Sequence, residues 1–246
     1  MTYKNGIIHA AALSLLLTSA LAQAHDGGIR AEAGNAQASS DIVHAKVYVE
    51  GDGLVFHMAV AGEAGQSKPT PIGALAGSDV FAYVWPTTID SAAVGFEAQA
   101  GILAMAVTAH PDFDDTPLDD ENGDGDPGND GNVWHSHWVV LGPDETCGPG
   151  GLKVIDIPEG AAPKLPETWP NLPLLIDSPG HVPTLEDDTV EVRAPFADVG
   201  RVADAQFDAV VAGLRINANL HAPLLCVTDV LDIASGDLSL PGKVNQ

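Results

Sequence analysis

The chain has 246 residues, with 34 acidic and 10 basic side chains and a formal net charge of −24. A field of that sign repels the phosphates of nucleic acid and of anionic lipid, and it attracts cations. Nucleic acid is therefore excluded as a partner, while metal ions are favoured. A salt-rich or alkaline habitat would select the same charge, so charge alone does not decide between these two explanations.

The first residues have the pattern of a signal peptide. Lys4 supplies the positive end, the run 7–21 is apolar, and residues 22–24 read Ala-Gln-Ala, the small-x-small pattern that signal peptidases cleave. The apolar run is too short for a stable membrane span, and no later segment approaches one. We therefore predict export, with removal of residues 1–24 as a signal peptide, to the periplasm, the outer-membrane surface or the medium as a secreted protein. No transmembrane segment is expected in the mature chain.

Residues 25–40 are rich in small side chains and predict a flexible lead-in to a single domain over 41–246. That domain is dominated by short apolar or alternating runs between Gly and Pro, which is the pattern of strands in antiparallel sheets. The runs cover 41–50, 53–61, 80–85, 93–98, 101–109, 133–141, 152–157, 189–194, 206–217 and 224–233. The first two are joined by Gly-Asp-Gly and predict a hairpin, and the almost wholly apolar run 101–109 predicts a strand buried on both faces. A helical start, capped by Asp204, is an alternative for 206–217.

The stretch 158–195 is rich in proline and lacks periodicity, so it predicts a long ordered loop carried on the sheets. Many short strands joined by Gly and Pro turns are typical of two antiparallel sheets packed face to face. We predict an all-β fold, an antiparallel β-sandwich with long loops, one of them a calcium loop.

The chain has two cysteines, Cys147 and Cys226, and neither belongs to a C-x-x-C pair. In an exported protein the default is one disulfide, which would close a long loop and stabilise the fold by about 2–4 kcal/mol. A thiolate metal site is the alternative. We predict the disulfide.

Residues 112–132 form an acidic, glycine-rich stretch. Within it, the pattern D-x-N-x-D-G begins at residue 120 and matches calcium loops, in which alternate side chains converge on one ion. The predicted calcium ligands are Asp120, Asn122, Asp124, Asp126 and Asp130. Gly131 occupies the twelfth position, where a bidentate Glu is usual, and no helix flanks the loop, so we do not expect a sensor EF-hand. A disordered acidic loop is the alternative to a structural calcium site.

Three histidines flank this acidic stretch, since His110 precedes it and His135 and His137 follow it. Residues two apart in a strand share a face, with Cα atoms about 6.5–7 Å apart, so His135 and His137 can reach one ion. The alternative is a pair that packs between Trp134 and Trp138. Imidazole suits copper, zinc and nickel, and copper binds most tightly among divalent first-row ions, so the histidines favour copper.

Two other histidines are candidate ligands for different reasons. His25 would be the first residue after cleavage, and its α-amine and imidazole together can chelate copper as a histidine brace. His181 lies between prolines and has little conformational freedom to lose on binding. The alternatives are a flexible chain end and an ordinary loop histidine. The remaining mature-chain histidines lie in apolar strand patterns and are expected to be core or interface residues: His44, His57 and His221.

The stretch 107–118, the acidic loop and the run 134–140 (Trp-His-Ser-His-Trp-Val-Val) together resemble the MopE/CorA-like copper-binding surface proteins of methane-oxidising bacteria. The resemblance implies a β-rich exported domain with one mononuclear copper site and calcium. It places the copper ligands on His110 and His181, and a third ligand, a tryptophan oxidised to kynurenine, on Thr108. Threonine cannot become kynurenine, so the third ligand is absent here or is replaced by water or by a group such as His25.

We therefore predict an exported copper-binding protein for copper acquisition, buffering or delivery, with a structural calcium site. Its partners would be metal ions and a copper-receiving or cell-surface protein. Two alternatives remain: a copper oxidase or monooxygenase that uses the His25 brace, and a calcium-stabilised adhesion domain without a transition metal. The chain has no G-x-S-x-G or H-E-x-x-H motif and no phosphate-binding loop, so we do not expect an enzyme.

Overall fold

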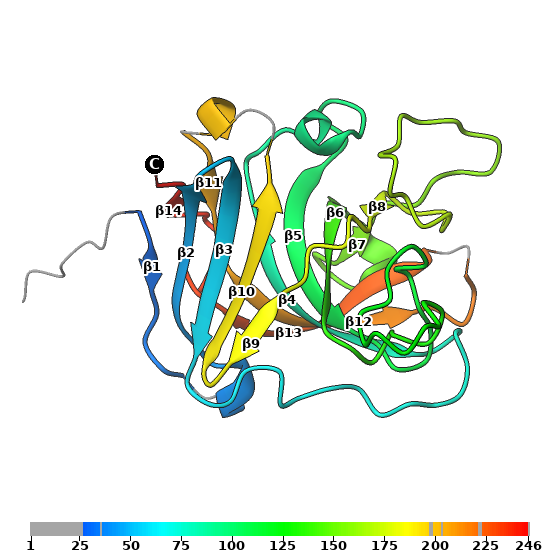
Figure 1. The fold of residues 1–246 in the computed structure, drawn as a ribbon, viewed down its shortest axis with the longest axis horizontal. Helices are drawn as coiled ribbons and strands as arrows, with labels where there is room; N and C mark the ends of the chain where they lie inside the picture. The colour runs from blue at the N-terminus through cyan, green and yellow to red at the C-terminus, as the bar shows by residue number, and fades with distance from the viewer. Residues whose placement is uncertain (1–26, 35, 197–198, 203, 221–222, 246) are drawn as a thin grey trace, which may run out of the picture.

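Figure 1 shows the computed structural model of the chain, which describes residues 27–34, 36–196, 199–202, 204–220 and 223–245. The predicted signal peptide 1–24 and two of the histidines, His25 and His221, lie outside the described residues. Strands dominate the described part, and its only helical elements are short 3-10 turns. No helix in this part is long and apolar enough to cross a membrane.

An open antiparallel sheet lies on one side of the molecule (Figure 1). Its strand order is β1-β2-β3-β10-β9. The bounds are β1 Ile29–Arg30, β2 Ile42–Glu50, β3 Gly53–Val60, β9 Thr184–Glu186 and β10 Thr189–Pro195. β2 and β3 form the predicted hairpin, and Gly51 supplies the positive φ of 63° that a tight turn needs.

The second sheet closes into a barrel. Its order is β5-β4-β12-β13-β7-β6, the pairing of β5 with β6 completes the ring, and β8 adds to β6 outside it. The bounds are β4 Asp79–Pro86, β5 Ile102–Ala109, β6 His135–Pro143, β7 Leu152–Val154, β8 Ile176–Asp177, β12 Val210–Ile216 and β13 Leu225–Ile233. A small ribbon pairs β11 Gln206–Phe207 with β14 Gly242–Lys243.

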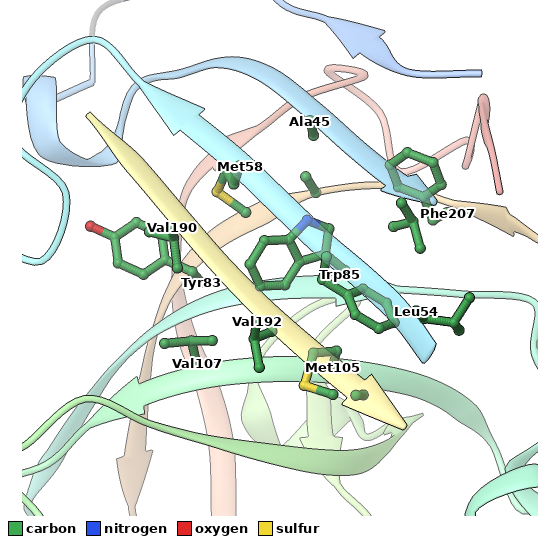
Figure 2. Packing of buried hydrophobic residues seen from close by; sticks show 14 of the residues in the cluster. Ala45, Leu54, Met58, Tyr83, Trp85, Met105, Val107, Val190, Val192 and Phe207 are labelled. Atoms are coloured by element: carbon green, nitrogen blue, oxygen red, sulfur yellow. The ribbon is translucent and has the colours of Figure 1, made fainter. Parts of the chain in front are cut away.

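The barrel wall separates two hydrophobic cores because alternate residues of a strand face opposite sides. On β4, Tyr83 and Trp85 face the open sheet, whereas Ala82 and Val84 face the barrel interior. Figure 2 shows the first core, in which Trp85 packs among side chains from β3, β5 and β10. The ring of Phe56 meets that of Trp85 edge to face at 6.0 Å. The second core lines the interior of the barrel.

The structure confirms the all-β antiparallel prediction and adds the closed barrel, which the strand patterns did not reveal. The run 206–217 forms β11 and β12 without a helical start. The predicted flexible lead-in contains β1, which pairs with β2, and the 3-10 turn η1 Ala38–Ser40. The Pro-rich stretch 158–195 carries the short strands β8 and β9 and the whole of β10, which the run 189–194 predicted. The strands β1, β8 and β9 have only two or three residues each, which is too few to produce a periodic pattern in the sequence. This explains why they were not predicted.

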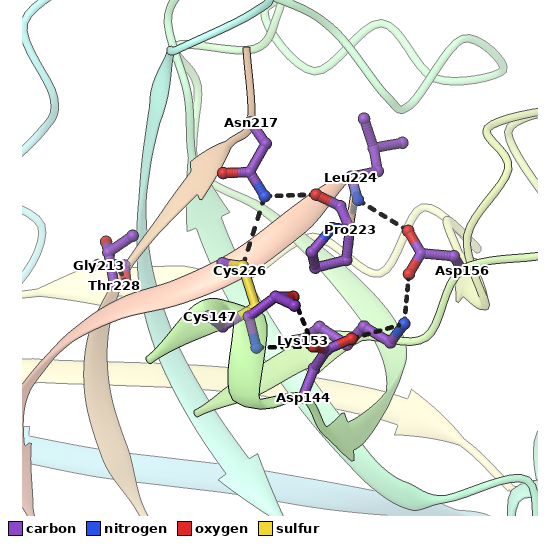
Figure 3. The surroundings of a disulfide bond; sticks show 11 residues. Asp144, Cys147, Lys153, Asp156, Gly213, Asn217, Pro223, Leu224, Cys226 and Thr228 are labelled. Atoms are coloured by element: carbon purple, nitrogen blue, oxygen red, sulfur yellow. Dashed lines mark hydrogen bonds and ion pairs between the residues drawn. A yellow bond between two sulfur atoms is a disulfide. The ribbon is translucent and has the colours of Figure 1, made fainter. Parts of the chain in front are cut away.

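A disulfide fastens the weakest seam of the barrel (Figure 3). β7 and β13 share a single residue pair, Lys153 with Cys226. Cys226 is bonded to Cys147, which ends the 3-10 turn η3 Glu145–Cys147 just before β7. Nearby, the Lys153 ammonium lies 3.1 Å from Asp144 and 2.7 Å from Asp156. The predicted disulfide is therefore confirmed, and no free cysteine is found among the described residues.

The pKa of Asp144 reports on this seam. Its carboxylate accepts hydrogen bonds from the hydroxyl (2.5 Å) and the backbone N–H (2.9 Å) of Thr146, and together with Lys153 these lower the pKa of Asp144 to about 2. Carbon-13 NMR of the Asp144 carboxyl should give a midpoint near that value. Thr146→Ala should raise the midpoint, because it removes the largest contribution, while Thr228→Ala on exposed β13 should leave it unchanged.

The direction of the pKa shift fixes its effect on stability. Because the folded-state pKa lies below the unfolded value of about 3.9, the contribution of Asp144 is complete above that pH and is lost as the pH falls towards 2. A wild-type midpoint near 4 would contradict the hydrogen-bonded arrangement at the seam.

Candidate metal centre

Two neighbouring strands of the barrel place the flanking histidines on one face. In the pairing of β5 with β6, Thr108 lies opposite His135 and Ala106 lies opposite His137. His110 follows the last residue of β5, two positions after Thr108 and therefore on the same side of the strand. The acidic stretch is the connection between these strands, seen in green beside β12 in Figure 1. The hairpin thus gathers three imidazoles at one end of the barrel.

Four buried side chains meet at this point. The ligand atoms of His110, Asp115, His135 and His137 all lie within 4.8 Å of one another, and no other such group occurs among the described residues. The Nε2 atoms of the three histidines lie 3.0, 3.2 and 3.2 Å from Asp115 Oδ1, in that chain order. Each of the four residues is at most 5% exposed. We call this set the metal group.

Hydrogen bonds at the far nitrogen of each ring determine which nitrogen carries the proton. His110 Nδ1 lies 2.9 Å from the Phe113 carbonyl and His135 Nδ1 lies 2.7 Å from the Val133 carbonyl, and a carbonyl only accepts. His137 Nδ1 lies 3.0 Å from the Ser178 hydroxyl, which itself donates to the Asp115 carbonyl at 2.7 Å. All three Nδ1 atoms therefore donate, and each neutral ring presents a bare lone pair at Nε2.

These lone pairs face one another and the Asp115 carboxylate. His110 Nε2 and His135 Nε2 are 2.9 Å apart, although neither carries a proton in the neutral ring. Asp115 Oδ1 and His137 Nε2 are buried and make no hydrogen bond of acceptable geometry. Electron pairs so close in a dry interior repel unless a proton or a cation lies between them. The ligands of a four-coordinate ion with bonds of about 2.0–2.1 Å are roughly 3.3 Å apart. The three distances to Asp115 Oδ1 and the distance between His110 and His135, all between 2.9 and 3.2 Å, are close to that spacing.

The acidic connection folds back to bring Asp115 to the histidines. The His110 and Phe113 rings stack with centroids 4.0 Å apart, and the His110 N–H donates to the Gly131 carbonyl at 2.7 Å. A Cβ at Gly131 would lie 1.7 Å from the Phe113 carbonyl oxygen, so only glycine fits there. Asp114 accepts from the Asp130 N–H at 2.7 Å and thereby fastens the two ends of the connection together. The glycine at the twelfth position of the expected calcium pattern therefore has a packing reason.

The charges in the metal group depend on burial and on mutual attraction. Burial opposes the charged form of His110, but the Asp115 carboxylate outweighs it and raises the pKa of His110. Burial also opposes charge on Asp115, yet His110 and His137 hold the pKa of Asp115 well below its usual range. At His135 burial dominates and lowers the pKa. A proton therefore occupies the place of a cation in the metal-free group, and binding of a metal ion would release it.

The structure joins His110 to the His135/His137 pair and leaves His181 outside the metal group. The His181 carbonyl accepts from the Ser136 hydroxyl at 2.6 Å, and its half-buried ring lines a separate cavity of about 80 Å³ beside His135. Thr108, at the position where the resemblance implies kynurenine, lies against the group, with its hydroxyl 3.1 Å from His135 Nε2. The resemblance pairs His110 with His181, whereas the structure groups His110 with His135 and His137.

The acidic side chains of the loop bond mainly to the loop itself. Asp120 accepts from the N–H groups of Gly123 (2.7 Å) and Gly125 (2.8 Å), and Asp130 accepts from the Glu121 N–H at 2.9 Å. The predicted calcium ligands are Asp120, Asn122, Asp124, Asp126 and Asp130. Within the described residues these carboxylates do not form a second group like the metal group. Calcium binding here stays a prediction.

Sequence reasoning missed Asp115 as a member of the metal group. It lies in a stretch so rich in acidic residues that the calcium pattern drew attention away from it. Its position five residues after His110, before the glycines of the loop, was the available signal. A search of family profiles, of curated proteins and of solved structures finds no match to this chain.

Proposed function

We propose that the protein binds one divalent transition-metal ion, copper in preference to the others, through His110, His135, His137 and Asp115. The observation that carries this proposal is the convergence of three Nε2 atoms on one buried carboxylate oxygen. Every ring is oriented by a hydrogen bond at Nδ1, which is the arrangement typical of histidines that ligate metals.

The chemistry of the donors supports a transition metal. Imidazole nitrogens with one carboxylate suit copper, zinc, nickel and iron, whereas calcium and magnesium prefer sets made of oxygen. In the order of affinities for divalent first-row ions, copper exceeds zinc. The resemblance to copper-binding surface proteins agrees with this choice of metal. A structural calcium ion in residues 112–132 remains part of the proposal.

Burial of the metal group supports a protein that holds its ion. The four side chains are between 1% and 5% exposed, so a bound ion would have little contact with bulk solvent. Copper buffering or storage outside the cytoplasm fits such a site better than rapid delivery to a receiving protein. Export rests on the signal-peptide pattern of residues 1–24.

The test is a metal titration of the purified, metal-stripped protein. We expect one tightly bound equivalent of Cu(II), with electron paramagnetic resonance showing coupling to three nitrogens, and displacement of bound Zn(II) by Cu(II). His181→Ala should behave as the wild type does, because that ring is outside the metal group. The proposal would be overturned if no divalent metal ion bound stoichiometrically. If copper failed to displace bound zinc, the assignment of the metal would change from copper to zinc.

A further inference from the structure

The interior of the barrel contains a cavity of about 290 Å³, and the metal group forms one end of it. His110, Asp115 and His137 line the cavity together with apolar side chains from β4, β5, β6, β12 and β13. A barrel of about eight strands is normally just filled by its own side chains. A barrel of six strands is narrower, so its closure alone does not produce an internal cavity. Alanine at Ala82, Ala106 and Ala212 leaves the space open.

The other end of the cavity reaches the surface. Its lining includes Ile102, at the end of β5 away from Thr108, and Ile102 is 40% exposed. Ile102 and Thr108 lie near opposite ends of β5, so the cavity follows most of the length of that strand. A volume of about 290 Å³ spread over that length is narrow.

Two leucines that line the cavity are held in an uncommon backbone conformation. Leu238 and Leu240 line the cavity with φ values of 58° and 53°, in the left-handed region that such residues rarely adopt. Backbone strain of this kind persists where the surrounding structure enforces it, often beside ligands. An empty cavity also lowers the stability of a protein. Both observations indicate that the cavity binds a ligand.

Charge identifies the end of the occupant that meets the metal. A divalent ion with three neutral imidazoles and the Asp115 carboxylate has a net charge of about +1, and the apolar lining includes no lysine or arginine. A monoanionic oxygen donor would neutralise that charge. Without the metal, the same donor would face Asp115 and be repelled.

We infer that the barrel binds a slender aliphatic carboxylate, with its chain along the cavity and its carboxylate as a fifth ligand of the metal ion. At the volume of about 30 Å³ that liquid water occupies per molecule, the cavity holds roughly ten non-hydrogen atoms, the size of octanoate. This inference rests on the proposed metal site and adds a ligand class to it.

The experiment follows the Cu(II) absorption band of the metal-loaded protein during titration with butyrate, hexanoate, octanoate and dodecanoate. We expect a spectral shift and an affinity that rises about fourfold per methylene up to octanoate, as burial of each CH₂ predicts, and then levels off. The metal-stripped protein should bind octanoate at least tenfold more weakly. Octan-1-ol lacks the carboxylate, so its affinity should be the same for the metal-loaded and the metal-stripped protein.

A matched pair of variants tests the place of the chain. Ala212→Leu narrows the cavity from β12, a strand that contributes no residue to the metal group, and it should weaken octanoate binding at least tenfold while copper still binds. Ala93→Leu makes the same change on the exposed 3-10 turn η2 Ser91–Val94 and should have no effect. If Ala212→Leu does not fold, the chain-length series of the wild type still decides the matter.

The outcomes separate the two proposals. Tight copper with no spectral shift, or with equal affinity for butyrate and octanoate, would overturn the carboxylate inference and leave the metal site intact. Equal octanoate binding with and without metal would overturn the inferred orientation of the ligand. Failure to bind copper, in contrast, would remove the proposed function and this inference with it.

Discussion

Replacing His137 with alanine should lower the copper affinity of the protein by more than about 100-fold. Loss of a group that only supports a metal ligand already costs 10–100-fold, and loss of a ligand itself costs more. His137 is 1% exposed, and it lies opposite Ala106, which offers no replacement donor. Competition against a chelator of known affinity measures the change.

Two further variants make the result specific. Ser178→Ala removes the hydroxyl that orients His137 Nδ1, so it should weaken copper by about 10–100-fold, less than loss of the ring. His181→Ala is the matched control, since it removes an imidazole from the neighbouring loop without touching the metal group. The ligand assignment would be wrong if His181→Ala weakened copper as much as His137→Ala did.

Loss of the disulfide should have the largest effect on stability. The Cys147–Cys226 bond joins residues 79 positions apart, and in the chain-entropy account a loop of that length contributes about 4 kcal/mol. It also fastens the seam at which β7 and β13 share one residue pair. We expect the Cys147→Ser/Cys226→Ser double variant to lose about that much free energy of unfolding in urea denaturation, and to expose the amides of β7 and β13 to hydrogen exchange first.

A reductant provides the control for this experiment. It should destabilise the wild type to the level of the double variant and should leave the double variant itself unchanged. Equal stability of the oxidised wild type and the double variant would show that the single residue pair and the Lys153 ion pairs hold the seam without the disulfide.

Much of the fold follows from local patterns in the sequence. The hairpin of β2 and β3 was predicted from two apolar runs around Gly-Asp-Gly, and the nearly continuous apolar run 101–109 indicated a strand covered on both faces. β5 is covered in this way, by the first core outside the barrel and the second core inside it. Closure of the barrel could not be predicted, because it depends on the pairing of β7 with β13 through a single residue pair.

The metal group was predicted only in part, for a physical reason. His135 and His137 share a face because strands have a period of two, and their neighbourhood to His110 follows once the acidic stretch is a connection between adjacent strands. Asp115 could not be distinguished by pattern, because its role depends on how the connection folds around Gly131. Nothing in the local sequence of His181 showed that its ring would point to a different cavity.

The four residues of the metal group lie close together in the sequence, and this affects the order in which the protein folds. Its four residues lie within one hairpin, residues 110–137, whereas the open sheet joins segments as distant as His57 and Glu191, 134 positions apart. Closing a short loop costs less entropy than closing a long one, so local hairpins form earlier than distant strand pairings. An ion can therefore be captured by the hairpin while the rest of the chain is still unfolded, and the later closure of the barrel then encloses it. The metal ion would in this way promote folding of the protein that binds it.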